Sequence, residues 1–316
     1  MIAKRKLGTS ELEITPLVLG GNVFGWTADE ATSFAILDAF VDAGGTMIDT
    51  ADVYSFWVPG HQGGESETVI GNWLKRSGKR DQVQIGTKVG FIAGLAPDVI
   101  RAACEASLQR LQTDHIDVYY EHKDDEKVPL AESLGTFEAL RREGKIREIG
   151  LSQFEPPRVT EAMDAAIANG IRPPCVLQTW YNLLERQKLE GPLLDATTEA
   201  GMSVMPFYAL ANGYLTGKYR SKDDLQKSVR GLRNIEYLEG KGPRILAALD
   251  EIARETGAAL GTVALAWTMA QPGIGGVLAS ATSVDQLEDS IAALSLELSP
   301  DQIARLDEAS AEVEPA

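Results

Sequence analysis

Cysteine is scarce in this chain. Of the 316 residues only Cys104 and Cys175 are cysteines, and they lie far apart in the sequence. Two isolated cysteines provide neither a disulfide framework nor the paired spacing of a metal site. The composition therefore predicts a protein of a reducing compartment, and we expect a cytoplasmic location.

Basic charge and long apolar runs are also in short supply. Lys and Arg total 30 against 46 Asp and Glu, which gives a net charge of −16. An acidic surface repels phosphate backbones and anionic lipid, so nucleic acid and membrane are not expected as partners. No run approaches the ~18 apolar residues of a membrane span, and the charged start "MIAKRKLGTSELEIT" lacks the apolar stretch of a signal peptide. Nothing here requires an obligate complex, so we expect a monomer or a weak homo-oligomer.

Several motifs of nucleotide-binding proteins and hydrolases are missing as well. No G-x-G-x-x-G follows an apolar run, and the chain has no P-loop, no H-E-x-x-H and no G-x-S-x-G. A Rossmann cofactor site, a P-loop nucleotide site, a zincin site and a nucleophile elbow therefore lack support.

What the sequence does contain is a regular alternation of short apolar runs and amphipathic segments. The runs are at 17–21, 46–49, 83–88, 116–120, 146–152, 175–180, 202–208 and 275–280. Between them, apolar residues recur near i, i+3 and i+4, as in helices that cover a sheet. Eight such units predict an α/β fold, a single (β/α)8 TIM barrel over residues 1–316. A short N-terminal β-hairpin is expected at 4–15, and extra helices are expected near the C-terminus.

Four polar residues follow or end three successive runs. Asp49 ends the second run and Tyr54 lies in the loop after it, Lys88 ends the third, and His122 follows the fourth. Each alone has an ordinary explanation: a turn cap, a loop aromatic, a surface cation and a structural histidine. In a barrel, however, the carboxyl ends of the strands form one rim, and active sites lie there. The four together therefore predict an active site.

The residue types indicate the chemistry. Asp49 would hold Lys88 charged, and Lys88 would stabilise a phenolate and so lower the pKa of Tyr54 from its reference of ~10. His122 would donate a hydrogen bond to a substrate oxygen. Such a tyrosine suits protonation of an alkoxide, which arises when hydride adds to a carbonyl. No protein side chain supplies hydride, so a cofactor is required.

The motifs that carry these residues resemble those of a known family. "IDTADVYS", "IGTKVG" and "YYEHKDD", followed by "GLSQF", "QTWYNLLER" and "PFYALANGYLTGKY", resemble the aldo-keto reductase family over essentially the whole chain. The resemblance implies a barrel that reduces aldehydes and ketones to alcohols with a nicotinamide cofactor. It implies a catalytic tetrad of Asp49, Tyr54, Lys88 and His122, with Tyr54 as the general acid.

The resemblance also implies cofactor contacts. Ser152 and Gln153 stand where the family has a Ser-Asn pair, Gln178 matches its carboxamide-binding glutamine, and Phe207 replaces its stacking tyrosine. The other implied contacts are Gly21, Asn22, Ala209, Leu210, Gly213, Lys218, Ser280, Thr282, Gln286, Asp289 and Ser290. Ser280 and Gln286 stand where some members carry Lys and Arg against the 2′-phosphate of NADP, so discrimination against NAD should be weaker. NADP(H) is the expected cofactor and NAD(H) the alternative.

The expected substrate is a small-molecule carbonyl compound or alcohol. Aromatic residues in the loops after the first three runs predict an apolar mouth: Phe24, Trp26, Phe56, Trp57 and Phe91. For each of them alone, ordinary packing is an equal explanation.

Two other functions compete with this interpretation. Asp49, Asp52, Glu121, His122 and Asp124 are the residue types that bind a divalent metal in a hydrolase, although Lys88 would repel the ion. A barrel of this family also serves as a cofactor-sensing regulatory subunit with little turnover, as the potassium-channel β subunits suggest. No metal is expected.

Overall fold

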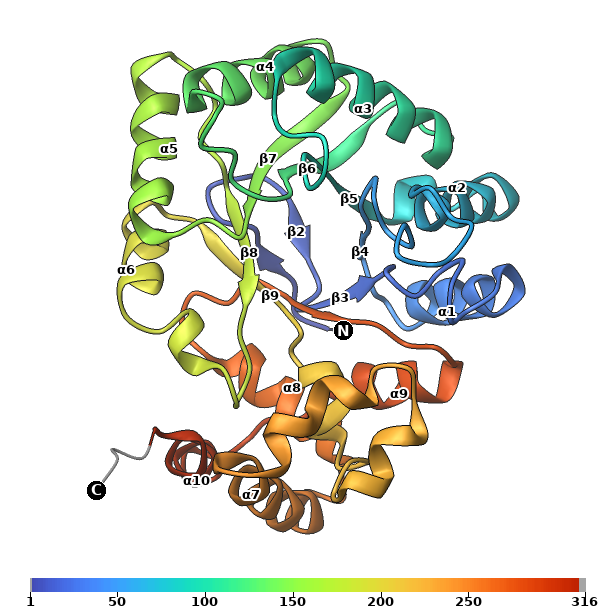
Figure 1. The fold of residues 1–316 in the computed structure, drawn as a ribbon, viewed down its shortest axis with the longest axis vertical. Coiled ribbons are helices and arrows are strands. Elements are labelled where there is room, and N and C mark those ends of the chain that lie inside the picture. The colour runs from blue at the N-terminus through green and yellow to red at the C-terminus, as the bar shows by residue number, and fades with distance from the viewer. Residues whose placement is uncertain (1, 313–316) are drawn as a thin grey trace.

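A computed structural model describes residues 2–312 of the chain (Figure 1). Its main sheet has eight parallel strands in the order β10-β3-β4-β5-β6-β7-β8-β9. The strands are β3 (Leu17–Gly20), β4 (Met47–Asp49), β5 (Gln84–Val89), β6 (Ile116–Glu121), β7 (Ile146–Ser152), β8 (Val176–Trp180), β9 (Ser203–Phe207) and β10 (Val277–Ala279). A parallel bridge between Val204 and Ile274 links β9 to the residues before β10 and nearly closes the sheet. The predicted α/β barrel is confirmed.

Helices connect the strands and surround the barrel (Figure 1). Within the described range they are α1 (Glu30–Asp42), α2 (Glu65–Ser77), α3 (Pro97–Leu111), α4 (Leu130–Arg142), α5 (Pro156–Ala168), α6 (Pro192–Glu199), α7 (Lys241–Thr256), α8 (Leu260–Ala270), α9 (Val284–Ala292) and α10 (Pro300–Ser310). α7 and α8 both precede β10, and α10 follows α9, so the expected extra C-terminal helices are present. In residues 2–312 no helix combines the length and apolarity needed to cross a membrane.

Local sequence explains where several helices begin and end. α1 starts after Asp29, whose side chain accepts a hydrogen bond from the Thr32 amide. α10 starts with a capping box in which Ser299 and Gln302 bond each other's backbone amides. α2 ends at Gly78, which adopts the left-handed conformation with φ 66°.

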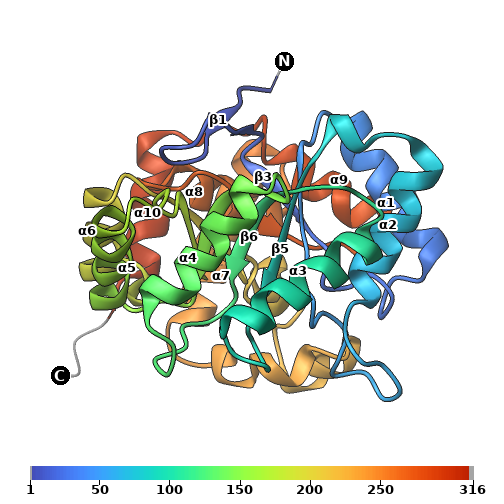
Figure 2. The same cartoon turned by 90° about the horizontal axis from the view of Figure 1, so that it is seen from above.

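An N-terminal hairpin lies at the end of the barrel opposite the loops that follow the strands (Figure 2). β1 (Arg5–Lys6) pairs antiparallel with β2 (Glu13–Ile14), as expected for residues 4–15. Leu7 and Ile14 are fully buried and belong to the apolar cluster inside the barrel. The Arg5 guanidinium donates to the carbonyls of Met269 and Ile274. The hairpin therefore closes the amino-terminal end of the barrel.

Side chains of each strand alternate between the barrel interior and the helix layer, as strand geometry requires. In β6, Val118 and Tyr120 belong to the interior cluster, whereas Tyr119 packs outward against Phe137 of α4. The Tyr120 ring fills the interior so closely that a Cβ on Gly150 would lie 2.4 Å from it. The interior is therefore a packed core, and only the ends of the strands are available for a site.

The connection after β9 is long and built from 3-10 turns: η3 (Ala211–Thr216), η4 (Lys222–Lys227) and η5 (Gly231–Leu238). Figure 2 shows it in orange at the end of the molecule opposite the N-terminus. It lies on the same side as the loop after β4, so it covers the rim where the predicted site residues are.

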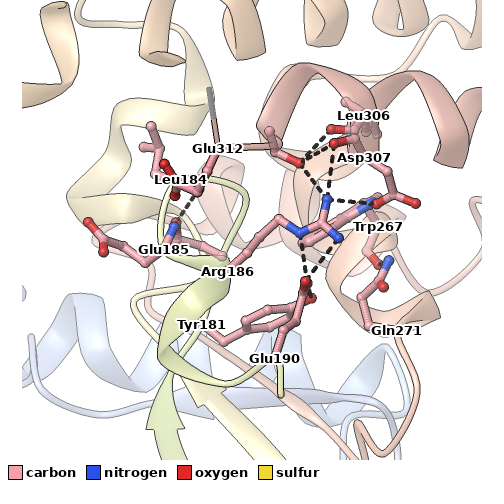
Figure 3. A network of polar contacts seen from close by, with 12 residues as sticks. Tyr181, Leu184, Glu185, Arg186, Glu190, Trp267, Gln271, Leu306, Asp307 and Glu312 are labelled. Atoms are coloured by element: carbon pink, nitrogen blue, oxygen red, sulfur yellow. Dashed lines mark hydrogen bonds and ion pairs between the residues drawn. The ribbon is translucent and has the colours of Figure 1, made fainter. Parts of the chain in front are cut away.

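A polar cluster fastens the C-terminal helix to the barrel (Figure 3). Arg186, in η2 (Arg186–Lys188), pairs with Glu190 at 2.7 Å and donates to the Asp307 carbonyl at 3.1 Å. Its guanidinium lies 5.6 Å from the Trp267 ring, and the Trp267 indole donates to the Asp307 carboxylate. The loop after β8, α8 and α10 thus share one set of contacts.

Candidate active site

Asp49 and Lys88 form a buried ion pair at the carboxyl ends of β4 and β5. These strands are neighbours in the sheet, and both side chains point into the barrel. The Lys88 Nζ donates to Asp49 Oδ2 at 2.6 Å and to the Thr50 carbonyl at 2.7 Å. Asp49 is 0% and Lys88 1% exposed, so each charge depends on the other for compensation.

Tyr54 reaches this pair from the loop after β4. Its hydroxyl donates to Asp49 Oδ2 at 3.2 Å and accepts from Lys88 Nζ at 3.0 Å. The loop is held by a bond from the Tyr54 amide to the Ala51 carbonyl. At Ser55 the backbone takes φ 74°, and its hydroxyl donates to the Phe24 carbonyl. The short turn therefore aims the phenol back over the strand ends.

His122, the residue directly after β6, completes the group. Its ring centroid lies 6.1 Å from that of Tyr54 and 4.9 Å from that of Phe91. Its Nδ1 is buried and finds no hydrogen-bond partner among residues 2–312. The structure thus brings together all four residues of the predicted tetrad at one rim.

Burial dominates the electrostatics of the group. Burial lowers the pKa of Lys88, with Asp49 acting in the opposite direction, and burial with the Lys88 charge holds the pKa of His122 well below its usual value. Burial and the Asp49 carboxylate raise the pKa of Tyr54 well above 10. The expected lowering of the Tyr54 pKa is therefore wrong, because burial and the Asp49 carboxylate that contacts the phenol both disfavour the phenolate. The phenol keeps its proton and the imidazole is neutral.

A second polar layer lies behind the tetrad, and the sequence analysis missed it. Glu67 of α2 is fully buried; it accepts from the Thr87 hydroxyl at 2.5 Å and from Arg110 Nε at 2.7 Å. Burial and the Glu67 charge raise the pKa of Asp52 to about 7. The available signal was a carboxylate on the apolar stripe of a helix, since Glu67 lies one turn before Ile70. Thr87 precedes Lys88, so this layer supports the strand that carries the lysine.

The residue types at the ends of β7, β8 and β9 fit a nicotinamide ring. Ser152 pairs with Gln178 across β7 and β8, and Trp180 pairs with Phe207 across β8 and β9. A hydroxyl and an amide suit a carboxamide, and a half-buried aromatic ring suits stacking. Gln178 is also linked to the tetrad, since its Nε2 donates to Asp49 Oδ1 at 2.6 Å. Gln153 has φ 57° and donates to the His122 carbonyl.

Other predicted cofactor residues lie near the ends of β3, β9 and β10. The Ser280 hydroxyl donates to Asn22 Oδ1 at 2.7 Å, and Gly21 bonds the Asp49 carbonyl through its amide. Gly213 has φ 90°, and a Cβ there would lie 2.8 Å from Lys218 Nζ. Two further predicted cofactor residues directly precede η3: Ala209 is buried and Leu210 is half-buried.

The predicted cofactor residues from Thr282 to Ser290, around the start of α9, are engaged in hydrogen bonds within the protein. Thr282 donates to Gln286 Oε1 through both its amide and its hydroxyl, at 3.1 Å. The Ser290 hydroxyl is buried and donates to the Gln286 carbonyl, and the Asp289 carbonyl accepts from Thr262. The stretch 275–290 contains no Lys or Arg. Hydroxyl and amide groups are therefore what this end offers a ligand.

Aromatic side chains form a continuous wall beside the tetrad. Trp26 and Phe56 each lie 5.5 Å from Trp57, and Phe56 lies 6.4 Å from Phe91. Phe56, Trp57 and Phe91 are 38–41% exposed. Phe24 does not join them, because it is fully buried in the core between sheet and helices. Four of the five predicted mouth residues thus meet at the rim.

The residues considered as metal ligands do not gather. Among the residues that the structure describes, no three His, Cys, Asp or Glu side chains are grouped so as to hold a metal ion. Asp49 is instead occupied by Lys88, and Asp124 by Arg158 at 2.7 Å. Both oxygens of Glu121 are buried without a described partner.

Comparison with known proteins agrees with this geometry. The sequence model of the Aldo/keto reductase family matches residues 16–311. The chain is 31% identical over 299 residues to Aldo-keto reductase str7 of Strobilurus tenacellus, with 92% of this chain and 84% of that protein covered. It is 32% identical over 314 residues to Uncharacterized oxidoreductase YrpG of Bacillus subtilis (strain 168), with 96% and 94% covered. Aldo-keto reductase family 7 member A3 of Homo sapiens is 39% identical over 209 residues, with 65% and 61% covered. The chain therefore belongs to the aldo/keto reductase family of oxidoreductases.

Proposed function

We propose that the protein reduces aldehydes and ketones to alcohols with a nicotinamide cofactor, and that Tyr54 is the general acid. The observation that carries this proposal is the position of the Tyr54 hydroxyl, 3.0 Å from Lys88 Nζ and 3.2 Å from Asp49 Oδ2. This phenol stands at the rim beside an aromatic wall, which suits the apolar body of a small carbonyl compound. Family membership supports hydride chemistry at this place.

The side chains have complementary roles in this proposal. The carbonyl oxygen accepts hydrogen bonds from Tyr54 and from neutral His122, both of which stabilise negative charge that develops on it. Tyr54 then gives its proton to that oxygen, and Lys88 stabilises the phenolate left behind. Asp49 keeps Lys88 charged and in place. The bound cofactor supplies the hydride.

We further propose NADP(H) as the favoured cofactor, with NAD(H) also accepted. Ser152, Gln178 and Phe207 would hold the nicotinamide, and Gly213 with Lys218 would approach the phosphates. Ser280, Thr282 and the start of α9 would hold the 2′-phosphate. The family generally uses NADPH, but the absence of Lys and Arg from 275–290 supports weak discrimination.

The direct test is Tyr54→Phe, assayed with an activated aromatic aldehyde and with NADPH and NADH in parallel. Removing the proton donor should reduce kcat by about 10²–10⁴-fold. Cofactor affinity, measured by fluorescence titration, should change little, because the ring remains. Tyr119→Phe is the matched control, since its buried hydroxyl lies outside the site and has no partner among residues 2–312.

If Tyr54→Phe turned over substrate as fast as the wild type, Tyr54 would not be the general acid. Binding of both cofactors without turnover by the wild type would instead favour the regulatory subunit. A stoichiometric bound metal that is required for activity would instead favour a metal-dependent hydrolase.

A further inference from the structure

Asp52 lies in the same short loop as Tyr54 and belongs to the polar layer behind the tetrad. Its amide donates to the Lys88 carbonyl at 3.2 Å, which ties the loop to the strand that carries the lysine. Its Oδ1 is buried and has no hydrogen-bond partner among residues 2–312. A carboxylate oxygen that is buried without a partner is unfavourable, so this position favours the protonated form.

The cations near Asp52 already have partners. Lys88 pairs with Asp49 at 2.6 Å. Arg110 pairs with Glu67 at 2.7 Å. Asp52 is thus a third carboxyl group beside two cations, and in the part of the chain that the structure describes it forms no ion pair. With a proton on Asp52 the cluster is neutral, and without that proton it carries one uncompensated negative charge.

The elements packed against this loop each place one titratable group near Asp52. These groups are Glu67 on α2, Lys88 on β5, Arg110 on α3 and Tyr119 on β6. The Tyr119 phenol stays neutral, because burial raises its pKa well above 10. Burial and the Glu67 charge raise the pKa of Asp52 to about 7, against the opposite influence of the two cations. Asp52 therefore changes its charge near neutral pH.

The charge on Asp52 acts on the lysine of the tetrad. Burial lowers the pKa of Lys88, and the carboxylates of Asp49, Asp52 and Glu67 raise it, with Asp49 the strongest of the three. Lys88 is the group that stabilises the Tyr54 phenolate in the proposed reaction. Because proton transfer from Tyr54 leaves a negative charge beside Lys88, a further negative charge on Asp52 makes that transfer less favourable.

We infer that Asp52 controls the rate of the proposed reduction through its own proton: Tyr54 gives its proton to the substrate readily while Asp52 is neutral, and this transfer slows when Asp52 releases its proton to solvent. The inference rests on the proposed reductase function and names how that function is regulated by pH. Asp52 is a positioning residue in this role, because it acts through Lys88 and needs no contact with substrate or cofactor.

The test is the pH dependence of a single turnover, in which an activated aromatic aldehyde is added to protein that already holds NADPH. For the wild type the rate constant should fall about tenfold between pH 6 and pH 9, as expected for a neighbouring charge worth about one pKa unit. Asp52→Asn has nearly the same shape and no charge, so it should keep the low-pH rate throughout. A change by the same factor at every pH would indicate a structural role and overturn the inference.

Asp98→Asn is the matched control. Asp98 is an exposed carboxylate at the start of α3, which follows the strand that carries Lys88. The variant loses the same charge from the same end of the barrel. It should keep the pH profile of the wild type, and a flat profile for it would contradict the assignment to Asp52.

Glu67→Gln keeps the inference testable if Asp52→Asn folds poorly. Gln retains an acceptor for the Thr87 hydroxyl, whereas loss of the Glu67 charge leaves Arg110 free to compensate Asp52. The fall in the rate constant should therefore move to lower pH by about one unit. A fall that stays at the same pH would overturn the inference.

Carbon-13 NMR of protein labelled at the aspartate carboxyl groups separates the inference from the proposed function, because it needs no turnover. One resonance should titrate near pH 7 and be missing from the spectrum of Asp52→Asn. Titration of Asp52 near its reference value of ~3.9 would overturn the inference and leave the proposed function in place. No turnover by the wild type would overturn the proposed function and the inference with it.

Discussion

Glu121 is a carboxyl group placed where ionisation is unfavourable. It ends β6, points away from the barrel interior and is fully buried, and neither oxygen has a partner among the described residues. Burial raises its pKa from 4.5 to about 7. In the unfolded chain the same group ionises near 4.5, so the folded state binds its proton more tightly.

This difference predicts that stability falls as pH rises. The tighter proton binding of Glu121 contributes to the free energy of unfolding. This contribution is fully present below about pH 4.5 and is lost as pH rises through about 7, because the folded state then loses a proton that the unfolded chain has already released. Glu121→Gln should therefore be more stable than the wild type at pH 8, by up to about 3 kcal/mol. The free energy of unfolding, measured by denaturant titration at pH 5 and pH 8, checks it.

Glu132→Gln is the control for this change, because Glu132 is exposed at the start of α4. It should leave the pH dependence unaltered. A Glu121→Gln profile parallel to that of the wild type would contradict the prediction.

The rim loops show why single residues are hard to place from sequence. Phe24 and Trp26 are two positions apart, yet Phe24 is in the core and Trp26 at the mouth. Gly25 between them turns the backbone with φ 71°, and no periodic pattern governs burial in such a turn. The tetrad could be predicted because strand ends converge, whereas the Tyr54 pKa depends on opposing influences that only distances resolve.

At the scale of elements, the start of α9 is where cofactor preference should be set. Ser283 caps the helix, and Gln286 is exposed one turn later, bonded to Thr282. Gln286→Arg would add a cation beside the expected 2′-phosphate position. We expect the NADPH-to-NADH ratio of kcat/KM to rise about tenfold, as a charged hydrogen bond allows.

Gln302→Arg adds the same charge at the start of α10, away from the rim, and should leave that ratio unaltered. A ratio equally unaffected by Gln286→Arg would mean that the 2′-phosphate lies elsewhere.

Regular elements were predictable and the connections were not. The eight apolar runs coincide with β3–β10, because strand periodicity and Gly stops are local signals. The turn η3 contains left-handed residues such as Asn212, with φ 54°, which sequence patterns do not specify. The 5.3 Å contact between Arg230 and the Trp26 ring joins segments that are far apart in the sequence, so no local pattern predicts it either.

For the whole molecule, the hairpin and the barrel interior form one core. Ile14 is fully buried in the interior cluster, close to Gly276. Ile14→Ala should lower the free energy of unfolding by about 3 kcal/mol, from lost burial and the cavity left behind. The kinetic constants should be unchanged below the unfolding temperature, since the site lies at the other end.

Leu232→Ala, which shortens a side chain that is 73% exposed, should change stability by less than about 0.5 kcal/mol. Loss of activity in folded Ile14→Ala would show that the two ends are coupled.

The placement of the hairpin has a consequence for how such a chain diversifies. The hairpin, whose Leu7 and Ile14 pack into the interior cluster, lies at one end of the barrel, and the loops that carry the proposed site lie at the other end (Figure 2). Substitutions in the loops can therefore change ligand contacts with little effect on the packing of the hairpin. Related proteins can exchange whole rim loops, and so acquire new substrates, while the barrel and its hairpin still fold.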